Sequence, residues 1–267
     1  MSEQQLAEFA RTHAWRIPFD TSPRHLAGPG DARHVTHGLA AAGWTRTSDP
    51  LSPEIVLSSP DHRYRLDFAP GSGMFAWWRL WAGSTDTEPG WTASFGELVP
   101  AEILACFTDA LVAPSPNEHS SPLDVADAAG WLLDACRVAS SPDGACRLMQ
   151  RIGDLATWQV EVHDPDRGRH APRLWHAHFN ARTPGHLVST FVTALADPAP
   201  LQRGMHDRTA HYSTVQNPSP LRPEQIVAAH KTRLSTLRAQ ARAARRQSSK
   251  PTTALAPSAA ARPAARR

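Results

Sequence analysis

Three short runs in the first half of the chain have the periodicity of β-strands. From Arg63 to Phe68, aromatic and aliphatic residues alternate with charged ones, which is the period of two expected of a strand with one buried face. Two tryptophan-bearing runs follow, Ala76–Ala82 and Trp91–Phe95. From Ile103 to Leu111 the apolar positions are three and four residues apart instead, which predicts an amphipathic helix. The pattern therefore predicts an antiparallel meander followed by a helix.

The same pattern recurs in the second half of the chain. Ser58-Ser-Pro-Asp61 returns as Ser140-Ser-Pro-Asp143, and Trp91-Thr-Ala-Ser-Phe95 returns as Trp175-His-Ala-His-Phe179. The first pair is offset by 82 residues and the second by 84, so the two copies differ by short insertions. Because Ser-Pro-Asp is typical of a turn, each copy is predicted to place it in a hairpin between two strands.

Each copy is also predicted to open and close with a helix. Opening helices are expected at about Ala32–Ala42 and Leu123–Ala135. Pro100 and Pro184 suit the first position of the closing helices, where no N–H is needed, and Thr183 is a candidate N-cap. The predicted fold class is α+β, with two tandem modules that each consist of a helix, an antiparallel β-meander and a helix. Because so small a module is marginally stable alone, the two copies are predicted to pack together.

Outside the two copies the composition changes. Residues 223–246 are rich in alanine and arginine and predict a basic C-terminal helix, and the Ser, Pro, Ala, Thr and Arg that follow predict a disordered tail. The predicted organisation is an N-terminal segment (1–21), repeat 1 (22–116), repeat 2 (121–200), a linker (201–222), the basic helix (223–246) and the disordered tail (247–267).

The repeated residues resemble a known family. The first copy carries the motifs Gly43-Trp44, Ser59-Pro-Asp61, Trp91-x-x-x-Phe95 and Phe107-x-x-Ala110-Leu111. The second copy carries them as Gly130-Trp131, Ser141-Pro-Asp143, Trp175-x-x-x-Phe179 and Phe191-x-x-Ala194-Leu195. These motifs are similar to those of the tandem domain of unknown function numbered 317, which is common in filamentous actinobacteria. The resemblance implies a tandem architecture and, since that family has no catalytic motif to carry over, no activity.

Charge divides the chain into an acidic body and a basic tail. Residues 1–220 hold 17 bases and 24 acids, a net charge of −7, whereas residues 221–267 hold eleven bases and one acid, a net of +10. Such a tail is typical of contact with DNA or RNA phosphates; it could equally solubilise the protein or fold back on the acidic body. The candidate contact residues in the tail are Lys231, Arg233, Arg238, Arg242, Arg245 and Arg246.

The repeat also predicts which side chains point away from the core. Trp78, Leu80 and Ala82 match apolar residues of the second copy and are expected to be buried, so their neighbours should lie on the open face of the sheet. The candidate nucleic-acid or partner surface on that face consists of Arg63, Arg65, Trp77, Arg79 and Trp81. Aromatic and arginine side chains on a sheet suit single-stranded nucleic acid. The same residue types are enriched at protein interfaces, and the favoured interpretation is that this face packs on the other repeat, on the N-terminal segment or on a second subunit.

Motifs for catalysis are absent from the sequence. There is no glycine-rich phosphate loop, no zinc-protease motif and no nucleophile elbow, so no catalytic residue is predicted. His176 and His178 share one face of a strand, as metal ligands often do, but the first copy has Thr92 and Ser94 at those positions. We therefore expect no metal and no cofactor. Three cysteines at unpaired spacing predict no disulfide framework, and Cys106 is expected on the buried side of its helix.

These observations predict a non-enzymatic cytoplasmic binding protein. No apolar run approaches 18 residues and the N-terminus lacks the pattern of a signal peptide, so no membrane segment is expected. The favoured function is a nucleic-acid-associated accessory factor that uses its basic tail. The alternative is a protein-interaction adaptor, with the modules paired to each other, to a partner or in a homodimer. A third reading is an enzyme or metal-binding protein without a recognisable motif.

Overall fold

The computed structural model describes residues 3–71, 76–113, 120–151 and 157–248. The α-helices are α1 (Glu3–Ala14), α2 (Arg33–Ala41), α3 (Ala101–Val112), α4 (Pro122–Ala128), α5 (Gly185–Ala196) and α6 (Pro223–Ser248). Two 3₁₀ turns are η1 (Arg24–Leu26) and η2 (Pro165–His170). The strands of the two repeats are β2 (Thr45–Arg46), β3 (Ile55–Ser58), β4 (Tyr64–Phe68), β5 (Trp78–Ala82), β6 (Trp91–Phe95), β7 (Leu132–Leu133), β8 (Val138–Ser140), β9 (Cys146–Arg151), β10 (Thr157–His163) and β11 (Arg173–Phe179). Three further strands are β1 (Pro18–Ser22), β12 (Leu201–Gly204) and β13 (Val215–Pro218).

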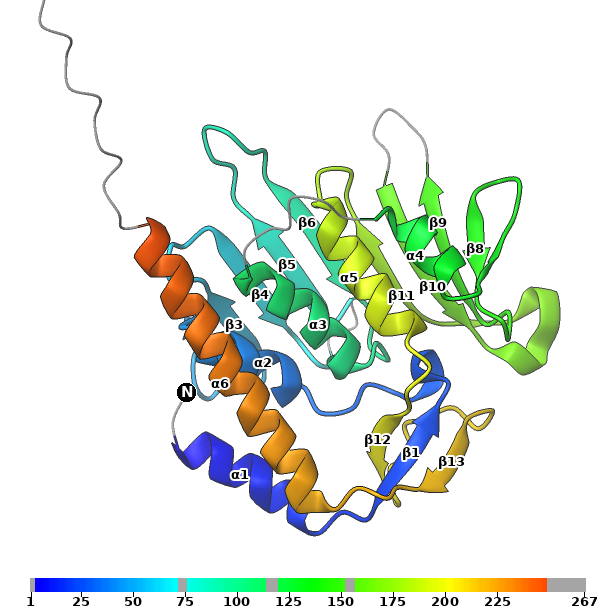
Figure 1. Cartoon of the computed structure of the whole chain (residues 1–267), viewed down its shortest axis with the longest axis horizontal. Helices are drawn as coiled ribbons and strands as arrows, with labels where there is room; N and C mark the ends of the chain where they lie inside the picture. Colours follow the sequence, from blue (N-terminus) through cyan, green and yellow to red (C-terminus); the bar gives the residue numbers. More distant parts are fainter. Residues whose placement is uncertain (1–2, 72–75, 114–119, 152–156, 249–267) are drawn as a thin grey trace, which may run out of the picture.

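The two repeats form one continuous ten-stranded sheet. Its order is β2-β3-β4-β5-β6-β11-β10-β9-β8-β7, and the neighbouring strands are antiparallel. Each repeat contributes a meander of five strands, and the last strand of one meander pairs with the last strand of the other. Figure 1 shows this sheet with helices α2 to α6 in front of it. The predicted α+β class and the predicted pairing of the two copies are therefore confirmed.

The seam between the repeats is symmetric. On β6 and β11, Ala177 lies opposite Phe95, His178 opposite Ser94, and Phe179 opposite Ala93. Because Ser94 and His178 occupy the same position in their repeats, a pseudo-twofold axis passes between them. At the seam, β6 and β11 therefore pair through the same positions of their repeats.

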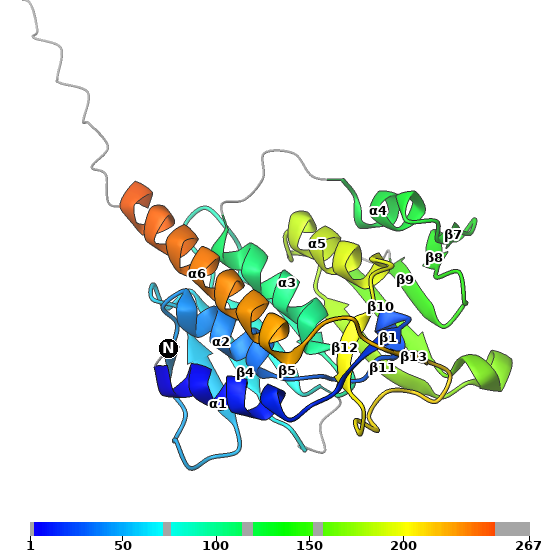
Figure 2. The same cartoon turned by 60° about the horizontal axis from the view of Figure 1, so that its bottom comes forward.

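The core lies between this sheet and the helices that cover one of its faces (Figure 2). Four phenylalanines from both repeats meet at its centre, with Phe95 and Phe179 at 5.5 Å between ring centroids and Phe107 and Phe191 at 6.4 Å. Both pairs are fully buried, and Trp91 is as buried as its counterpart, Trp175. The prediction that matching residues occupy equivalent buried sites is confirmed. It follows that neither repeat has a core of its own.

A small second sheet lies below the large one in the view of Figure 1. Its order is β12-β1-β13, so a strand from the start of the chain lies between two strands that follow repeat 2. Residues 201–222 were expected to be a linker, and residues 1–21 a separate N-terminal segment. Instead they pair with each other, which the sequence hid because β12 and β13 are four residues long and lack strict alternation.

Helix α6 packs on the body instead of extending into solvent. It crosses α1, α2 and α3 (Figures 1 and 2), and it buries Leu234, Leu237 and Ala241, which lie three and four residues apart. The helical part of the basic tail therefore folds back on the body. The predicted disordered tail lies outside the described residues from position 249 onward.

Three local predictions were wrong. Thr183 was expected to cap the closing helix of repeat 2, but the N-cap of α5 is Pro184, and the hydroxyl of Thr183 donates to the carbonyl of Thr92 instead. The opening helix of repeat 2 was expected to reach Ala135, but α4 ends at Ala128 because Gly130 adopts a left-handed backbone with φ of +81°, a helix-terminating conformation. Cys106 was expected to be buried, but it lies on the exposed side of α3. Among the helices formed by the described residues, none is both long and apolar enough to cross a membrane.

Candidate functional site

The face of the large sheet opposite the helices carries part of the predicted surface. Trp78, Leu80 and Ala82 point into the core, so Arg79 and Trp81 lie on the open face, as the repeat predicts. The guanidinium of Arg65, on the neighbouring strand, lies 5.8 Å from the ring centre of Trp81. Arg65 also donates to the carboxylate of Asp67 at 2.8 Å. These four side chains form a connected polar and aromatic strip over β4 and β5.

Two predicted members of that surface lie elsewhere. Arg63 precedes β4; it pairs with Glu88 in the loop between β5 and β6, and its guanidinium lies 5.1 Å from the ring of Tyr64. Trp77 precedes β5 and packs against the edge of the core, with its ring 6.4 Å from that of Phe68. Both residues flank the regular strands, where simple alternation no longer fixes the side of the sheet.

Repeat 2 extends the open face with residues that were not predicted. Arg147 is the counterpart of Arg65, and Arg147 and Arg151 are exposed on the outer side of β9. Glu161 of β10 lies opposite Arg147. The repeat could have predicted Arg147 as a member of this surface, because the offset of 82 residues maps Arg65 onto Arg147.

We call the outer surface of β4, β5, β9, β10 and β11 the open face. Its charged side chains within these strands are Arg65, Arg79, Arg147, Arg151 and Arg173, whose guanidinium pairs with Glu161, together with the carboxylates Asp67 and Glu161. Positive charge therefore exceeds negative charge on a surface of a body whose net charge is −7. Such a separation favours polyanionic partners at this surface.

The two histidines of β11 lie on the open face beside the seam. Burial lowers the pKa of His176 and His178, and the nearby charges of Arg173 and Arg151 respectively act in the same direction. Both shifts favour the neutral form of the ring. Among the described residues, no group of three or more histidine, cysteine or carboxylate side chains is placed to hold a metal ion.

The basic residues of α6 divide into anchors and exposed charges. Arg233 donates twice to the carboxylate of Asp109, at 2.6 Å each, and once to the carbonyl of His34. Arg245 reaches the carbonyl of Ala42 at the end of α2. The remaining candidates are the half-buried Arg238 and the exposed Lys231, Arg242 and Arg246. Two of the six predicted contact residues are thus used to hold the helix on the body.

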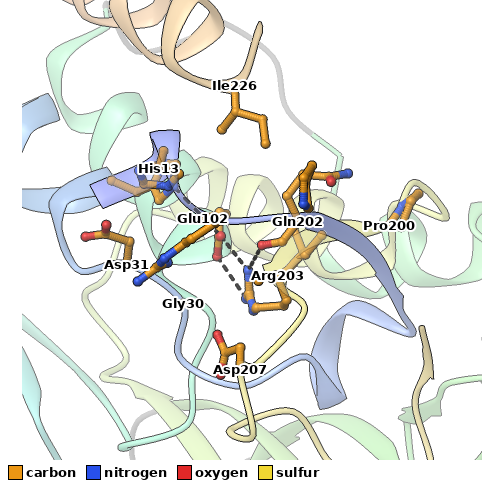
Figure 3. Close-up of a pocket in the computed structure, with 14 residues that line it drawn as sticks. His13, Gly30, Asp31, Glu102, Pro200, Gln202, Arg203, Asp207 and Ile226 are labelled. Carbon is orange, nitrogen blue, oxygen red and sulfur yellow. Dashed lines mark hydrogen bonds and ion pairs between the residues drawn. The ribbon is translucent and has the colours of Figure 1, made fainter. Parts of the chain in front are cut away.

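A separate pocket of about 170 Å³ lies where α1, α3, α6 and the small sheet meet (Figure 3). Arg203 of β12 lines it with a buried guanidinium that donates to both carboxylate oxygens of Glu102, at 2.7 and 3.2 Å. Gln202 also lines it, and its Oε1 is buried without a hydrogen-bond partner among the described residues. The pocket is therefore polar at one wall, with Ile226 on the opposite side (Figure 3).

The ionisable groups of this pocket are largely paired with one another. Burial lowers the pKa of His34, whose Nε2 lies 3.9 Å from Glu102, too far for a hydrogen bond. Burial alone would raise the pKa of Glu102, but the charges of Arg203 and His34 together with the hydrogen bonds that Glu102 accepts outweigh it and lower the value. Burial would likewise raise the pKa of Asp31, but Arg33 lowers it to about 2. Structural ion pairs also perturb pKa values. The ion pairs in the pocket walls therefore explain these shifts without a catalytic role.

These observations define a class of protein in which two successive α+β repeats share one antiparallel sheet. Two stretches of the chain, residues 58–117 and 140–201, match the model of the SPDY domain, a domain of unknown function (DUF317). The chain therefore carries two tandem copies of this domain, and the resemblance stated from the motifs is confirmed. No curated protein and no solved structure matches the chain.

Proposed function

We propose that the protein is a non-enzymatic, cytoplasmic, nucleic-acid-associated factor that holds a single strand across the open face. The observation that carries the proposal is the excess of arginine on a sheet face that none of the described helices covers and that continues through both repeats. Sheets of this kind bind single strands through phosphate contacts and base stacking. In this proposal Arg65 and Arg147 hold the backbone and Trp81 supplies a stacking surface.

The position of α6 supports the sheet, and not the tail, as the main contact in this proposal. Helix α6 covers α2 and α3 on the helix side of the molecule (Figure 2), so its exposed charges face away from the open face. A strand lying on the sheet therefore meets Arg65 and Arg147 before it meets Arg242 or Arg246. In this proposal the basic C-terminal region is a second, sequence-independent site for polyanions.

The test is binding of a fluorescently labelled single strand longer than about 16 nucleotides, measured by anisotropy at several salt concentrations. If four arginines each neutralise a phosphate, the slope of log affinity against log salt is roughly −2.8. The double variant Arg65→Gln, Arg147→Gln should reduce the magnitude of that slope by about 1.4. Trp81→Ala should weaken binding by about 1–3 kcal/mol through lost stacking.

The matched control is the double variant Arg242→Gln, Arg246→Gln, which removes two exposed charges from α6 instead. It should leave the affinity for the single strand nearly unchanged. If this control weakens binding as much as the sheet variant does, the open face is not the main contact. If the unchanged protein binds no strand at low salt, the nucleic-acid proposal fails.

A protein-interaction adaptor is the second candidate, and a different surface favours it. Trp15 is 89% exposed, Ile17 59% and Met205 51%, and the N–H of Met205 donates to the carbonyl of Ile17 at 2.9 Å. Large exposed apolar side chains that lie together are typical of protein interfaces. If this patch joins two copies of the chain, sedimentation velocity should show a dimer that the double variant Trp15→Ser, Met205→Ser abolishes.

A further inference from the structure

The seam between β6 and β11 carries two histidines that the fold itself does not require. His176 and His178 lie on the open face of β11, because the residues that alternate with them point into the core. Repeat 1 has Thr92 and Ser94 at these positions and forms the equivalent strand without an imidazole. Neither ring makes a hydrogen bond to another described residue. The ring nitrogens are therefore left for a ligand.

A third histidine close to this face is used differently. His163 lies at the end of the neighbouring strand β10. Its Nδ1 is 3.2 Å from the carbonyl oxygen of Ala171, and its Nε2 is 3.4 Å from the carboxylate of Glu161. Arg173 donates to the same carboxylate at 3.2 Å. Because His163 already has partners within the fold, it is a matched control for the two histidines of the seam.

The register of the sheet places His178 midway between the two arginines that are proposed to hold the backbone of a single strand. The pseudo-twofold axis between Ser94 and His178 also relates Arg65 of β4 to Arg147 of β9. Five steps between neighbouring β-strands separate β4 from β9, and at about 4.8 Å a step they lie about 24 Å apart. A nucleic-acid strand that contacts both arginines must therefore pass over the seam, beside His178.

The groups that face His178 carry no negative charge. Ser94 of β6 and Gln159 of β10 lie directly opposite it. Burial lowers the pKa of His178, and the charge of Arg151 on β9 lowers it further. A phosphate beside the ring would supply the negative charge that these neighbours lack, and it would favour the imidazolium.

His176 faces one carboxylate, which is already neutralised. Burial and the charge of Arg173 lower the pKa of His176, and His178 acts in the same direction. Glu161, opposite His176 on β10, acts the other way, but it is paired with Arg173 at 3.2 Å. On the β6 side the facing residue is Gly96, whose backbone N–H donates to the carbonyl of His176. A phosphate would therefore act on His176 as it does on His178.

We infer that a single strand held on the open face crosses the seam with a phosphate beside His178 and His176, and that both rings are charged in that complex. The inference rests on the proposed function, and it adds that the two repeats form one continuous binding site. Because the complex binds protons that the free protein does not, its affinity increases as the pH falls. Thr92 and Ser94 carry no such proton, so this dependence belongs to repeat 2.

The experiment measures the affinity of the full-length protein for a fluorescently labelled oligothymidylate of about 20 nucleotides, by anisotropy at pH 7.5 and at pH 6.0 and at constant ionic strength. We expect the affinity to be about threefold higher or more at pH 6.0, because two further positive charges then meet the phosphates. The double variant His176→Thr, His178→Ser should lose most of this increase. It gives β11 the residues that repeat 1 has at the same positions, so the strand should still form.

Two further measurements locate the effect. The control variant His163→Gln should keep the increase, because His163 is held by Glu161 and not by the bound strand. In a ¹H–¹³C spectrum, the Cε1–H signal of His178 should titrate at a higher pH when the oligothymidylate is present, because the phosphate stabilises the charged ring.

The outcomes separate this inference from the proposed function. Binding of equal affinity at pH 7.5 and pH 6.0 would overturn the inference and leave the proposed function standing. An increase that survives in the double variant, or that disappears equally in His163→Gln, would also overturn it, and so would a His178 signal that titrates at the same pH with and without the strand. Failure to bind at low salt at either pH would instead refute the proposed function itself.

Discussion

The buried side chain of Arg203 connects three parts of the fold through its hydrogen bonds. Its guanidinium donates to the carbonyls of Ala27, Gly28 and Gln202 and to both oxygens of Glu102. These acceptors come from β12 itself, from the start of α3 and from the loop before α2. A single side chain therefore ties the small sheet to the helical layer of repeat 1.

Breaking this pair should be costly. Arg203→Leu would leave the buried carboxylate of Glu102 without its partner, and we expect a loss of about 3–5 kcal/mol in the free energy of unfolding. Urea unfolding followed by circular dichroism measures it, and Arg208→Gln, at an exposed position on the same segment, is the control. A loss below about 1 kcal/mol would show that the pair contributes little beyond what hydrophobic packing supplies.

At the scale of helices and strands, the main feature is the contact of α6 with α1 and α2. Phe9 of α1 lies among four histidines, stacked at 4.0 Å between ring centroids with both His13 and His230 and within 6 Å of His34 and His37. Nδ1 of His37 lies 3.3 Å from Nε2 of His230. This contact joins three helices through rings that fit together only while they are uncharged.

The charged groups that face the cluster come from each helix packed there. Arg33 of α2 lies 5.1 Å from the ring of Phe9, and Arg233 of α6 lies near His34. The carboxylates of Asp31 and Glu102 are paired with Arg33 and Arg203 respectively. The nearby acids are therefore already neutralised, and they offer little compensation for a protonated imidazole.

The docking of α6 should consequently weaken in acid. Burial lowers the pKa of His37 to about 4 and of His230 to about 3, and it also lowers the pKa of His13 and His34. A lowered histidine pKa means that the neutral form is favoured in the folded protein. The stabilisation is complete above the unfolded pKa of about 6.5 and is lost as the pH falls towards 4.

Unfolding in urea at pH 7.5 and at pH 5.0 measures this loss. We expect a decrease of about 2 kcal/mol for each of His37 and His230 between the two values. The double variant His37→Gln, His230→Gln, less stable at pH 7.5, should show a much smaller decrease. An equal decrease in the variant and the original protein would assign the acid sensitivity to other groups.

At the scale of the whole molecule, the seam between β6 and β11 makes two repeats into one cooperative unit. Phe95 and Phe107 of repeat 1 are in contact with Phe179 and Phe191 of repeat 2. Each repeat thus completes the core of the other. Sharing one core compensates for the small size of a single module, which buries too little apolar surface alone.

Truncating either central phenylalanine should therefore destabilise both repeats together. Phe107→Ala and Phe191→Ala should each cost about 3–5 kcal/mol, with a single unfolding transition that coincides by tryptophan fluorescence and by circular dichroism. Leu51→Ala, at a 93% exposed leucine, should have little effect. Two separate transitions would show that the repeats unfold independently.

The sequence by itself determined the features that depend on neighbours within a few residues. Periodicity predicted β4, β5, β6, α3 and α5, and the repeat predicted which side of β5 is buried. The repeat also predicted that the two copies pack together, because each copy has the same apolar face and cannot bury that face alone. The Ser-Pro-Asp turns followed from their own short-range hydrogen bonds.

Only the tertiary structure decided where the flanking segments and their charged side chains go. Arg63 and Trp77 sit beside strands where alternation ends, so their side of the sheet follows from packing. Glu102, which pairs with Arg203, and Asp143, which pairs with His25, are each more than 100 positions away from their partner in sequence. The docking of α6 depends on α1, which is also far from it in sequence. Such contacts are specified by the summed complementarity of surfaces far apart in sequence, which no local pattern encodes.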